Sequence, residues 1–590
     1  MKKIVNKKSI ILLVTILLLC ARMLYLYSLR CSHFIDEFYS MGFANSKGVA
    51  FFIYPVTDSD GSQHLKYYKE WSDGQDIHSY LTVDEGEEFD FLNVIDNKLQ
   101  DTAPANFEIM VHFVCSFFPG EFSWAFPFSV NFVFFIASLI LVFKISQKNL
   151  KNSKFGFVNA YICMIFFSFT IAGSGAFTFL RMYGVLSFYA LLMLFAVQNL
   201  LSATNKKQEI LYSLILYFAV FMGLFTHPLY VIYAFWLTAF TCLYLLFSKR
   251  IAESFKRGGT VLASLVTFVL VYPFNYGRVS TWMTDDNVTG YSFFTRLIFS
   301  NMHMFGESIG FYIPFTYANI ISWLGILFII TFSVTCLCFL FRNEKWFKSF
   351  KAFFLKLYKS LLGIVTDIFK NLLPINYIAF LTVIAYMLTV TAVTPVNTQY
   401  YVARYFMPGM FPLIICFVSF VNSVWNAFES KKRYIAFCLS SILLIILLLI
   451  QSFVFVNPFY FNKPYDDEEI LHSLTEGADV MIFGDRMSAL YSLMVPLRDI
   501  NSFYFGLYTD DVSEISIFPE NSFYLMIRSD CFEEDDSRAD LVDGLALEGS
   551  TDDFAEKILT NASYDYEIER LENFYSFAGD YAIYKVAPIL

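Results

Sequence analysis

Two adjacent carboxylates, Asp36 and Glu37, follow the first long apolar run of the chain in the stretch SHFIDEFYSMGFANS at 32–46. A carboxylate placed beside a hydroxyl can act as a general base and remove its proton. Two neighbouring carboxylates can also hold a divalent cation together with phosphate oxygens. The pair therefore predicts a polar reaction site at the end of the first apolar segment, and leaves open whether a metal ion takes part.

Two arginines stand at the starts of later apolar runs, Arg181 before a run that ends near 201 and Arg404 before one that ends near 428. The guanidinium group is planar and permanently charged, and it can bind a phosphate with two parallel hydrogen bonds. An arginine at a lipid phosphate and a carboxylate at an acceptor hydroxyl would together support transfer from a lipid-phosphate donor. The chain has no Gly-rich phosphate loop, so nothing in it indicates a soluble nucleotide substrate.

Each of these residues also has a simpler interpretation. The acidic pair would suit a solvated turn, and both arginines could anchor helix ends among lipid headgroups. His112, within a short apolar segment, and His227, between two apolar runs, would each suit a hydrogen-bonding role as well as a ligand role. The choice between these interpretations depends on where the chain crosses the membrane.

The composition indicates a membrane protein. The chain has 590 residues, of which 57% are hydrophobic and only 16% are charged, against about 25% charged in a soluble domain. The net charge is −10, and no contiguous basic face of the kind that binds nucleic acid is visible. The ten cysteines include no C-x-x-C pair, so we expect neither a zinc site nor a thioredoxin-like motif.

Apolar runs long enough to span a bilayer recur along the chain. They predict eleven transmembrane helices, at 9–29, 122–145, 155–174, 181–201, 209–226, 228–247, 259–275, 313–340, 373–393, 405–428 and 434–456. With the N-terminus in the cytoplasm and the first helix uncleaved, every basic cluster falls in a cytoplasmic loop, as the positive-inside rule requires. The loop 341–372 repeats apolar residues and lysines at helical spacing, which predicts an amphipathic helix on the inner surface.

One apolar segment, 107–118, is about 12 residues long and too short to span the membrane. We therefore expect a helix that lies at the outer surface. This topology rests on the lysines of the predicted cytoplasmic loops. It places four other residues on one outer face: Asp36, Arg181, His227 and Arg404. The sequence thus predicts a multi-pass plasma membrane protein whose candidate site faces away from the cytoplasm.

The chain after residue 456 has a different composition from the membrane region. The segments 478–484 and 521–529 and a final pair near the C-terminus resemble strands, and 488–497 resembles a helix. We expect two domains: a polytopic domain over 1–456, with an outer loop at 30–121, and a small extracytoplasmic α/β domain over 457–590.

Five segments, in order, resemble motifs of the C-type (GT-C fold) glycosyltransferases. They are IDEFYS at 35–40, DTAPANFEIMVHF at 101–113, FLRMYGVLSFYALL at 179–192, LFTHPLYVIYAF at 224–235 and ARYFMPGMFPLI at 403–414. The chain is most similar to protein O-mannosyltransferases and to bacterial aminoarabinose and related transferases. The resemblance covers about 1–456 and does not extend to the C-terminal segment.

This resemblance implies a GT-C fold and a polyprenyl-phosphate-linked sugar as donor, transferred with inversion at the anomeric carbon. Asp36 matches the catalytic base, with Glu37 beside it to orient the base, bind a sugar hydroxyl or share a metal. Arg181 and Arg404 match positions near the donor phosphate. Other matching residues line the cavity: Asp101, Pro104, His112, Tyr183, His227 and Tyr405. The chain departs from the family pattern at Ala105, where a second proline is usual, and at the following Asn106, Phe107 and Glu108.

Several points stay open. The partners expected are membrane lipids, the lipid-linked donor, and an acceptor that is a cell-envelope glycan, a lipid or a protein. A transporter or flippase of lipid-linked sugars is an alternative, although its charges should lie near the middle of the membrane and its halves should repeat. A scaffold with a transferase fold but no activity is another alternative, and it predicts that Asp36 is dispensable.

Overall fold

The computed structural model describes residues 7–30, 33–57, 63–150, 156–272, 372–393, 402–426 and, apart from 533–548 and a few single or paired residues, 468–589. The chain divides into two compact units, which are described separately. The helical unit contains Met1–Met23, Phe132–Phe177 and Tyr183–Phe455, and the mixed unit contains Leu24–Asn131, Thr178–Met182 and Val456–Leu590.

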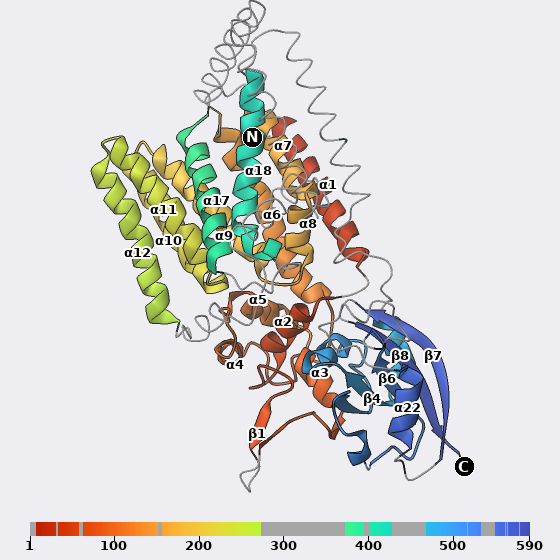
Figure 1. Ribbon diagram of the computed structural model, residues 1–590. Helices are drawn as coiled ribbons and strands as arrows, with labels where there is room; N and C mark the ends of the chain where they lie inside the picture. The colour runs from red at the N-terminus through yellow and green to blue at the C-terminus, as the bar shows by residue number, and fades with distance from the viewer. Residues whose placement is uncertain are drawn as a thin grey trace, which may run out of the picture. The chain divides into compact units, whose positions relative to one another are not determined.

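Long apolar helices make up the helical unit (Figure 1). They are α1 (Lys7–Ser28) and α6 (Ala125–Lys148), which each continue into the mixed unit, and α7 (Gly156–Phe169), α8 (Ile171–Thr178), α9 (Tyr183–Leu201), α10 (Lys206–Thr226), α11 (Tyr230–Phe247), α12 (Ile251–Val271), α17 (Pro374–Val393) and α18 (Val402–Asn426). Seven of the described helices are long and apolar enough to cross a membrane, and α7 with most of α8 forms a pair bent by 58° that would make an eighth.

These helices confirm most of the predicted spans within the described residues. The predicted span 405–428 corresponds to α18, whose apolar part, Arg404–Phe420, is shorter than a full span. The predicted spans 313–340 and 434–456 and the amphipathic helix 341–372 lie outside the described residues. The total of eleven spans therefore stays a prediction.

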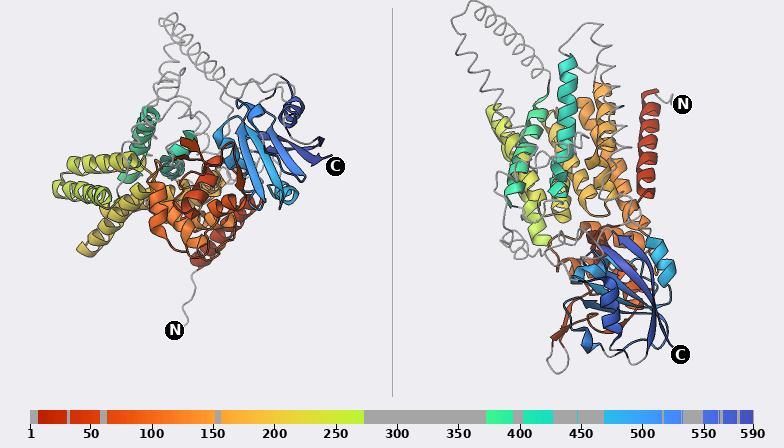
Figure 2. Two further views of the ribbon diagram at one scale, coloured as in Figure 1. Left: turned by 90° about the horizontal axis from the view of Figure 1, so that it is seen from below. Right: turned by 45° about the vertical axis from the view of Figure 1, so that its right-hand side comes forward.

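The mixed unit is built on a six-stranded sheet in the order β3-β5-β4-β6-β8-β7, whose strands run side by side in Figure 2. Its strands are β3 (Trp71–Asp73), β4 (Asp479–Gly484), β5 (Ser502–Leu507), β6 (Phe523–Arg528), β7 (Tyr566–Ser576) and β8 (Gly579–Pro588). The central strand β4 pairs in parallel with both β5 and β6. Its four middle residues, 480–483, are all apolar and fully buried, as is typical of parallel strands covered on both faces.

All three predicted strand regions are confirmed, as β4, β6 and the β7–β8 hairpin. The predicted helix at 488–497 is a 3-10 helix, η2 (Met487–Leu493). The sequence reading missed β5, and it missed β3, which comes from the outer loop and pairs antiparallel with β5. The sheet thus contains strands from both sides of the boundary predicted at 456, and that boundary stays a prediction.

The segment 30–121, predicted to be an outer loop, carries the short elements that bear the predicted site. They are α2 (Ile35–Asn45), the hairpin of β1 (Pro55–Thr57) and β2 (Gln63–Leu65), α3 (Gln75–Leu81), α4 (Phe91–Lys98) and α5 (Asn106–Cys115). Helix α5 is the short apolar helix expected near 107–118, and at 10 residues it is too short to span a bilayer.

Candidate active site

Helix α2, which carries Asp36 and Glu37, is fixed by the helices around it. The Asn45 side chain donates to the carbonyl of Leu81 on α3 at 2.7 Å. Gly42 allows the closest approach, since a Cβ at this position would lie 2.0 Å from the Tyr80 ring. From α4, the Asn97 side chain donates to the carbonyl of Ser46, the residue that ends α2, at 2.8 Å. These contacts hold the helix on both sides.

Glu37 is fully buried, and four donors surround its carboxylate. One oxygen accepts from Arg30 Nη1 at 3.0 Å and from the Leu180 amide at 2.6 Å. The other accepts from Arg30 Nη2 at 2.7 Å and from the Phe34 amide at 2.8 Å. The Arg30 side chain is also buried, 1% exposed, so this is a buried ion pair with two parallel hydrogen bonds.

Asp36 lies in the first turn of α2 and is half-buried. A carboxylate in the first turn is favoured by the partial positive charge of the helix N-terminus. Arg181 reaches the same turn: its Nη1 donates to the Asp36 carbonyl at 3.0 Å and to the Ser40 hydroxyl at 2.8 Å. The Arg181 guanidinium therefore binds the backbone of the helical turn that carries the Asp36 carboxylate.

A second group of charges adjoins this turn. The Lys98 ammonium is 2.5 Å from a carboxylate oxygen of Asp101 and 3.4 Å from one of Glu108. Glu108 also accepts from the Ser40 hydroxyl at 3.3 Å, which links this group to Arg181. Burial alone would raise the pKa of the Asp101 carboxyl, but Lys98 and Arg181 hold that pKa below its usual value. Asp101 is thus kept in its charged form.

The remaining outer-loop predictions lie nearby. Pro104 is buried just before α5. His112 is buried on α5, with its ring edge-on to Phe91 at a centroid distance of 5.7 Å, and burial lowers its pKa. Their roles in lining a cavity stay predictions.

Within the helical unit, the other predicted residues form an aromatic group. The rings of Tyr183, His227 and Tyr405 have centroid separations of 5.8 to 6.5 Å. Arg404 lies over the Tyr405 ring at 5.1 Å and donates to its hydroxyl at 3.2 Å. The Leu229 amide donates to His227 Nδ1 at 3.1 Å, so neutral His227 carries its proton on Nε2.

Four residues of the network were not found from the sequence: Arg30, Ser40, Lys98 and Glu108. Residue spacing could have indicated two of them. Ser40 lies one helical turn after Asp36, and Lys98 lies three residues before Asp101. Among the residues that the structure describes, no group of three or more His, Cys, Asp or Glu side chains could hold a metal ion. The question of a divalent cation therefore stays open.

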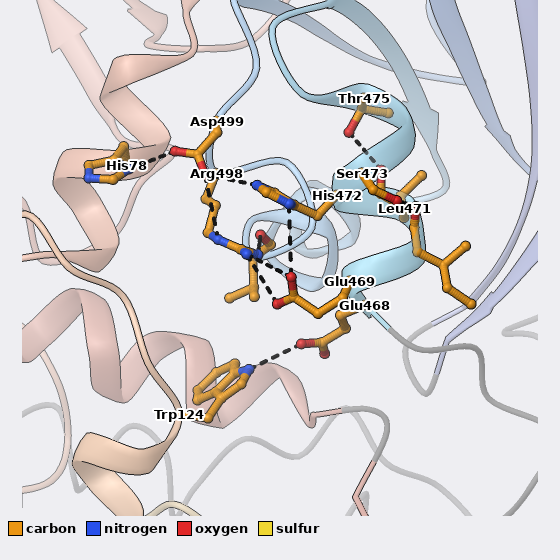
Figure 3. A network of polar contacts seen from close by, with 12 residues as sticks. His78, Trp124, Glu468, Glu469, Leu471, His472, Ser473, Thr475, Arg498 and Asp499 are labelled. Carbon is orange, nitrogen blue, oxygen red and sulfur yellow. Dashed lines mark hydrogen bonds and ion pairs between the residues drawn. The ribbon is translucent and has the colours of Figure 1, made fainter.

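Contacts within the mixed unit join the outer loop to the C-terminal segment (Figure 3). Helix α21 (Glu468–Thr475) begins with Glu468, whose carboxylate accepts from Trp124 Nε1 and lies near His33 Nδ1, both at 3.1 Å. Asp499 stands between His472, at 2.8 Å, and His78, at 3.2 Å. His33 precedes Asp36 by three residues, so the C-terminal segment braces the loop that carries the site.

Comparison with known proteins gives only structural likenesses. No protein family description and no curated protein matches the chain. Two crystal structures of ArnT from Cupriavidus metallidurans are similar, one bound to undecaprenyl phosphate and one in the apo state. Their identities to this chain are 8% and 10%, the TM-score is 0.44 in both cases, and each match covers 96% of this chain and 97% of the other. What each residue of this chain does is argued below from its own contacts.

Proposed function

We propose that this protein is a membrane glycosyltransferase that moves a sugar from a polyprenyl-phosphate donor to an acceptor hydroxyl. The observation that carries the proposal is the meeting of Arg181 with the first turn of α2, where Asp36 lies. This contact joins two of the five ordered motifs that resemble C-type transferases, although 145 residues separate them in the chain. A base and a phosphate-binding cation are the two groups that such a transfer needs.

In the proposed reaction, the Asp36 carboxylate removes the proton of the acceptor hydroxyl. The acceptor oxygen forms a bond to the anomeric carbon of the sugar, and the bond from that carbon to the phosphate oxygen breaks. The electron pair leaves with the polyprenyl phosphate, whose growing negative charge Arg181 stabilises. Attack from the side opposite the phosphate would invert the anomeric centre.

Glu37 has a different proposed role from that of Asp36. Both of its oxygens already accept two hydrogen bonds, from Arg30 and from the amides of Leu180 and Phe34. It is therefore proposed as a positioning residue that fixes the start of α2 and the backbone beside Arg181. The surrounding cations keep Asp101 ionised, so we propose that it accepts a hydrogen bond from a substrate hydroxyl and does not donate a proton.

Three further assignments are proposed without a contact that tests them. Arg404 is expected to bind donor phosphate, and His227 is expected to line the substrate cavity. The site is expected to face away from the cytoplasm.

The experiment compares the wild-type protein with Asp36→Asn, in nanodiscs, using a panel of radiolabelled polyprenyl-phosphate sugars and envelope extract. The matched control is Asp96→Asn, which makes the same charge change at an exposed residue of α4. We expect one donor to give labelled product with the wild type and the control. Asp36→Asn should still bind that donor but transfer at least about 100-fold more slowly, as loss of a general base usually requires.

Two outcomes would overturn the proposal. If Asp36→Asn transfers label as fast as Asp96→Asn, Asp36 is not the base. If no donor is turned over but the wild type moves labelled lipid between bilayer leaflets, the flippase alternative is correct.

A further inference from the structure

On helix α5 two ionisable side chains are buried, whereas a large apolar side chain is exposed. Glu108 and His112, one turn apart, are 0% and 1% exposed. Phe113 on the opposite face is 49% exposed. A surface helix in water shows the reverse arrangement, with the charged residues outward. The exposed face of α5 is therefore not matched to water.

The outward face continues into a larger apolar surface, here called the aromatic patch. It consists of Phe89, Leu92, Phe113, Phe117 and Phe118, which are each between 43% and 74% exposed. The Phe113 and Phe117 rings are edge to face at 5.2 Å, and Phe89 contacts both, at 6.0 and 5.3 Å. Phe89 comes from the segment before α4, whereas Phe113 lies on α5 and Phe117 in the turn that follows it, so folding gathers these three rings into one surface.

The aromatic patch is continuous with a membrane-spanning helix. The Phe118 ring stacks on that of Phe126, with centroids 5.1 Å apart and an interplanar angle of 12°. Phe126 is the second residue of α6, which is 24 residues long and predominantly apolar. Since α6 is long enough to cross a bilayer, the lipid surface has to begin near its end.

We propose that the aromatic patch lies in the headgroup region of the outer leaflet and anchors the outer loop to the membrane. Aromatic side chains concentrate at this depth, and monomers seldom leave a contiguous apolar surface of this kind in water. The acidic side chains on either side of Phe89, Glu88 and Asp90, favour zwitterionic headgroups over anionic ones. A protein partner at the patch is the competing possibility.

The anchor would act on the candidate site through α5. The helix that carries Phe113 on its lipid face carries Glu108 on its inner face, where Glu108 contacts Lys98 and Ser40. Membrane contact would therefore fix the depth at which Lys98, Asp101 and Arg181 stand relative to the headgroups. This consequence rests on the proposed function, whereas the contact with lipid does not.

The test is the depth of spin labels in the full-length protein, reconstituted in phosphatidylcholine nanodiscs. Leu92→Cys, Phe113→Cys and Phe117→Cys would each be labelled with a nitroxide. The control is Glu520→Cys, at an exposed acid of the C-terminal segment, and the unmodified protein gives the background from its own ten cysteines. Collisions with oxygen report lipid, and collisions with a water-soluble nickel chelate report water.

We expect the patch labels to have an oxygen-to-nickel collision ratio several-fold above that of the control. The proposal is overturned if the patch labels match the control, because the patch is then in water. It is also overturned if they are shielded from both reagents, because protein then covers the patch. Three separate positions keep the test usable if one variant does not fold, and no transferase activity is needed to read it.

Discussion

Replacing Glu37 by glutamine should loosen the start of α2 without removing a reacting group. Glutamine keeps the size of the side chain but puts an NH2 group where one carboxylate oxygen stood. Each oxygen of Glu37 faces one Arg30 nitrogen and one backbone amide, so the NH2 group must face two donors in either orientation. The change also leaves the buried Arg30 charge without its counter-ion.

The size of the effect follows from the burial of the pair. Removing one partner of a buried ion pair costs about 3–5 kcal/mol, because the other charge is left uncompensated. Glutamine keeps one acceptor oxygen, and Arg30 keeps its hydrogen bond to the Thr178 carbonyl at 2.5 Å, so we expect the lower end of this range. A loss of about 3 kcal/mol corresponds to a change of about 100-fold in a local opening equilibrium.

Hydrogen exchange measured by mass spectrometry reads this opening directly. The amides of Phe34 and Leu180 donate to Glu37, so peptides that cover 33–40 and 178–182 should exchange about 100-fold faster in Glu37→Gln. Asp36→Asn is the matched control, since its carboxylate lies in the same turn and we expect its exchange to be unchanged. Transfer by Glu37→Gln should fall, and lowering the temperature should restore part of it.

A double substitution separates structure from catalysis. Each single substitution, Arg30→Met or Glu37→Gln, removes one charge of the buried ion pair. The variant carrying both should therefore lose less stability than the sum of the two single variants. The reasoning is refuted if Glu37→Gln exchanges like the wild type while its transfer is abolished. Glu37 would then act on the substrate, and the four donors around it would not explain its presence.

Two further predictions concern the surroundings of this turn. Lys98 and Arg181 lower the pKa of Asp101 in the folded protein. Asp101 should therefore stabilise the protein above about pH 4, the pKa of an aspartate in an unfolded chain. This stabilisation should disappear as the pH falls through the pKa of Asp101 in the folded protein. Thermal unfolding of wild type and Asp101→Asn between pH 3 and 7 should therefore differ most near pH 7 and converge in acid; a constant difference would contradict the assignment. Gly42→Ala should destabilise the mixed unit, by about 1–3 kcal/mol if the clash resembles ordinary overpacking, because the new methyl group meets the Tyr80 ring. Gly42→Ala with Tyr80→Leu should recover part of that loss in the same unfolding assay, and no recovery would show that the Tyr80 contact is not the cause.

Sequence patterns predicted the parts of this structure that depend on short-range repeats. Apolar runs of about 20 residues located most of the described long helices, and the buried run of β4 located the central strand of the sheet. The membrane topology placed Asp36 and Arg181 on the same face, and the structure brings Arg181 to the first turn of α2. Each of these inferences needs only the spacing of apolar residues along the chain or the charge of the loops between the apolar runs.

Other features depend on contacts between distant segments, which no local pattern records. Strand β3 has three residues and gains its partner only because β5, more than 400 residues later, lies beside it. Glu108 departs from the family pattern and was left without a role, and its contacts with Lys98 and Ser40 appear only when α2, α4 and α5 are packed together. The sequence alone does not show whether Arg30 and Glu37 form a buried ion pair or are both exposed to solvent.

The adjacent acids illustrate how folding can give two similar residues different roles. Successive residues on an α-helix point about 100° apart, so Asp36 and Glu37 leave the helix in different directions. Glu37 turns to the buried side and binds Arg30, whereas Asp36 remains half-buried near Arg181. A cation shared by both carboxylates would require Glu37 to release Arg30, at a cost set by the burial of that pair. The contacts therefore favour the proposed roles of one positioning residue and one base over a pair of metal ligands.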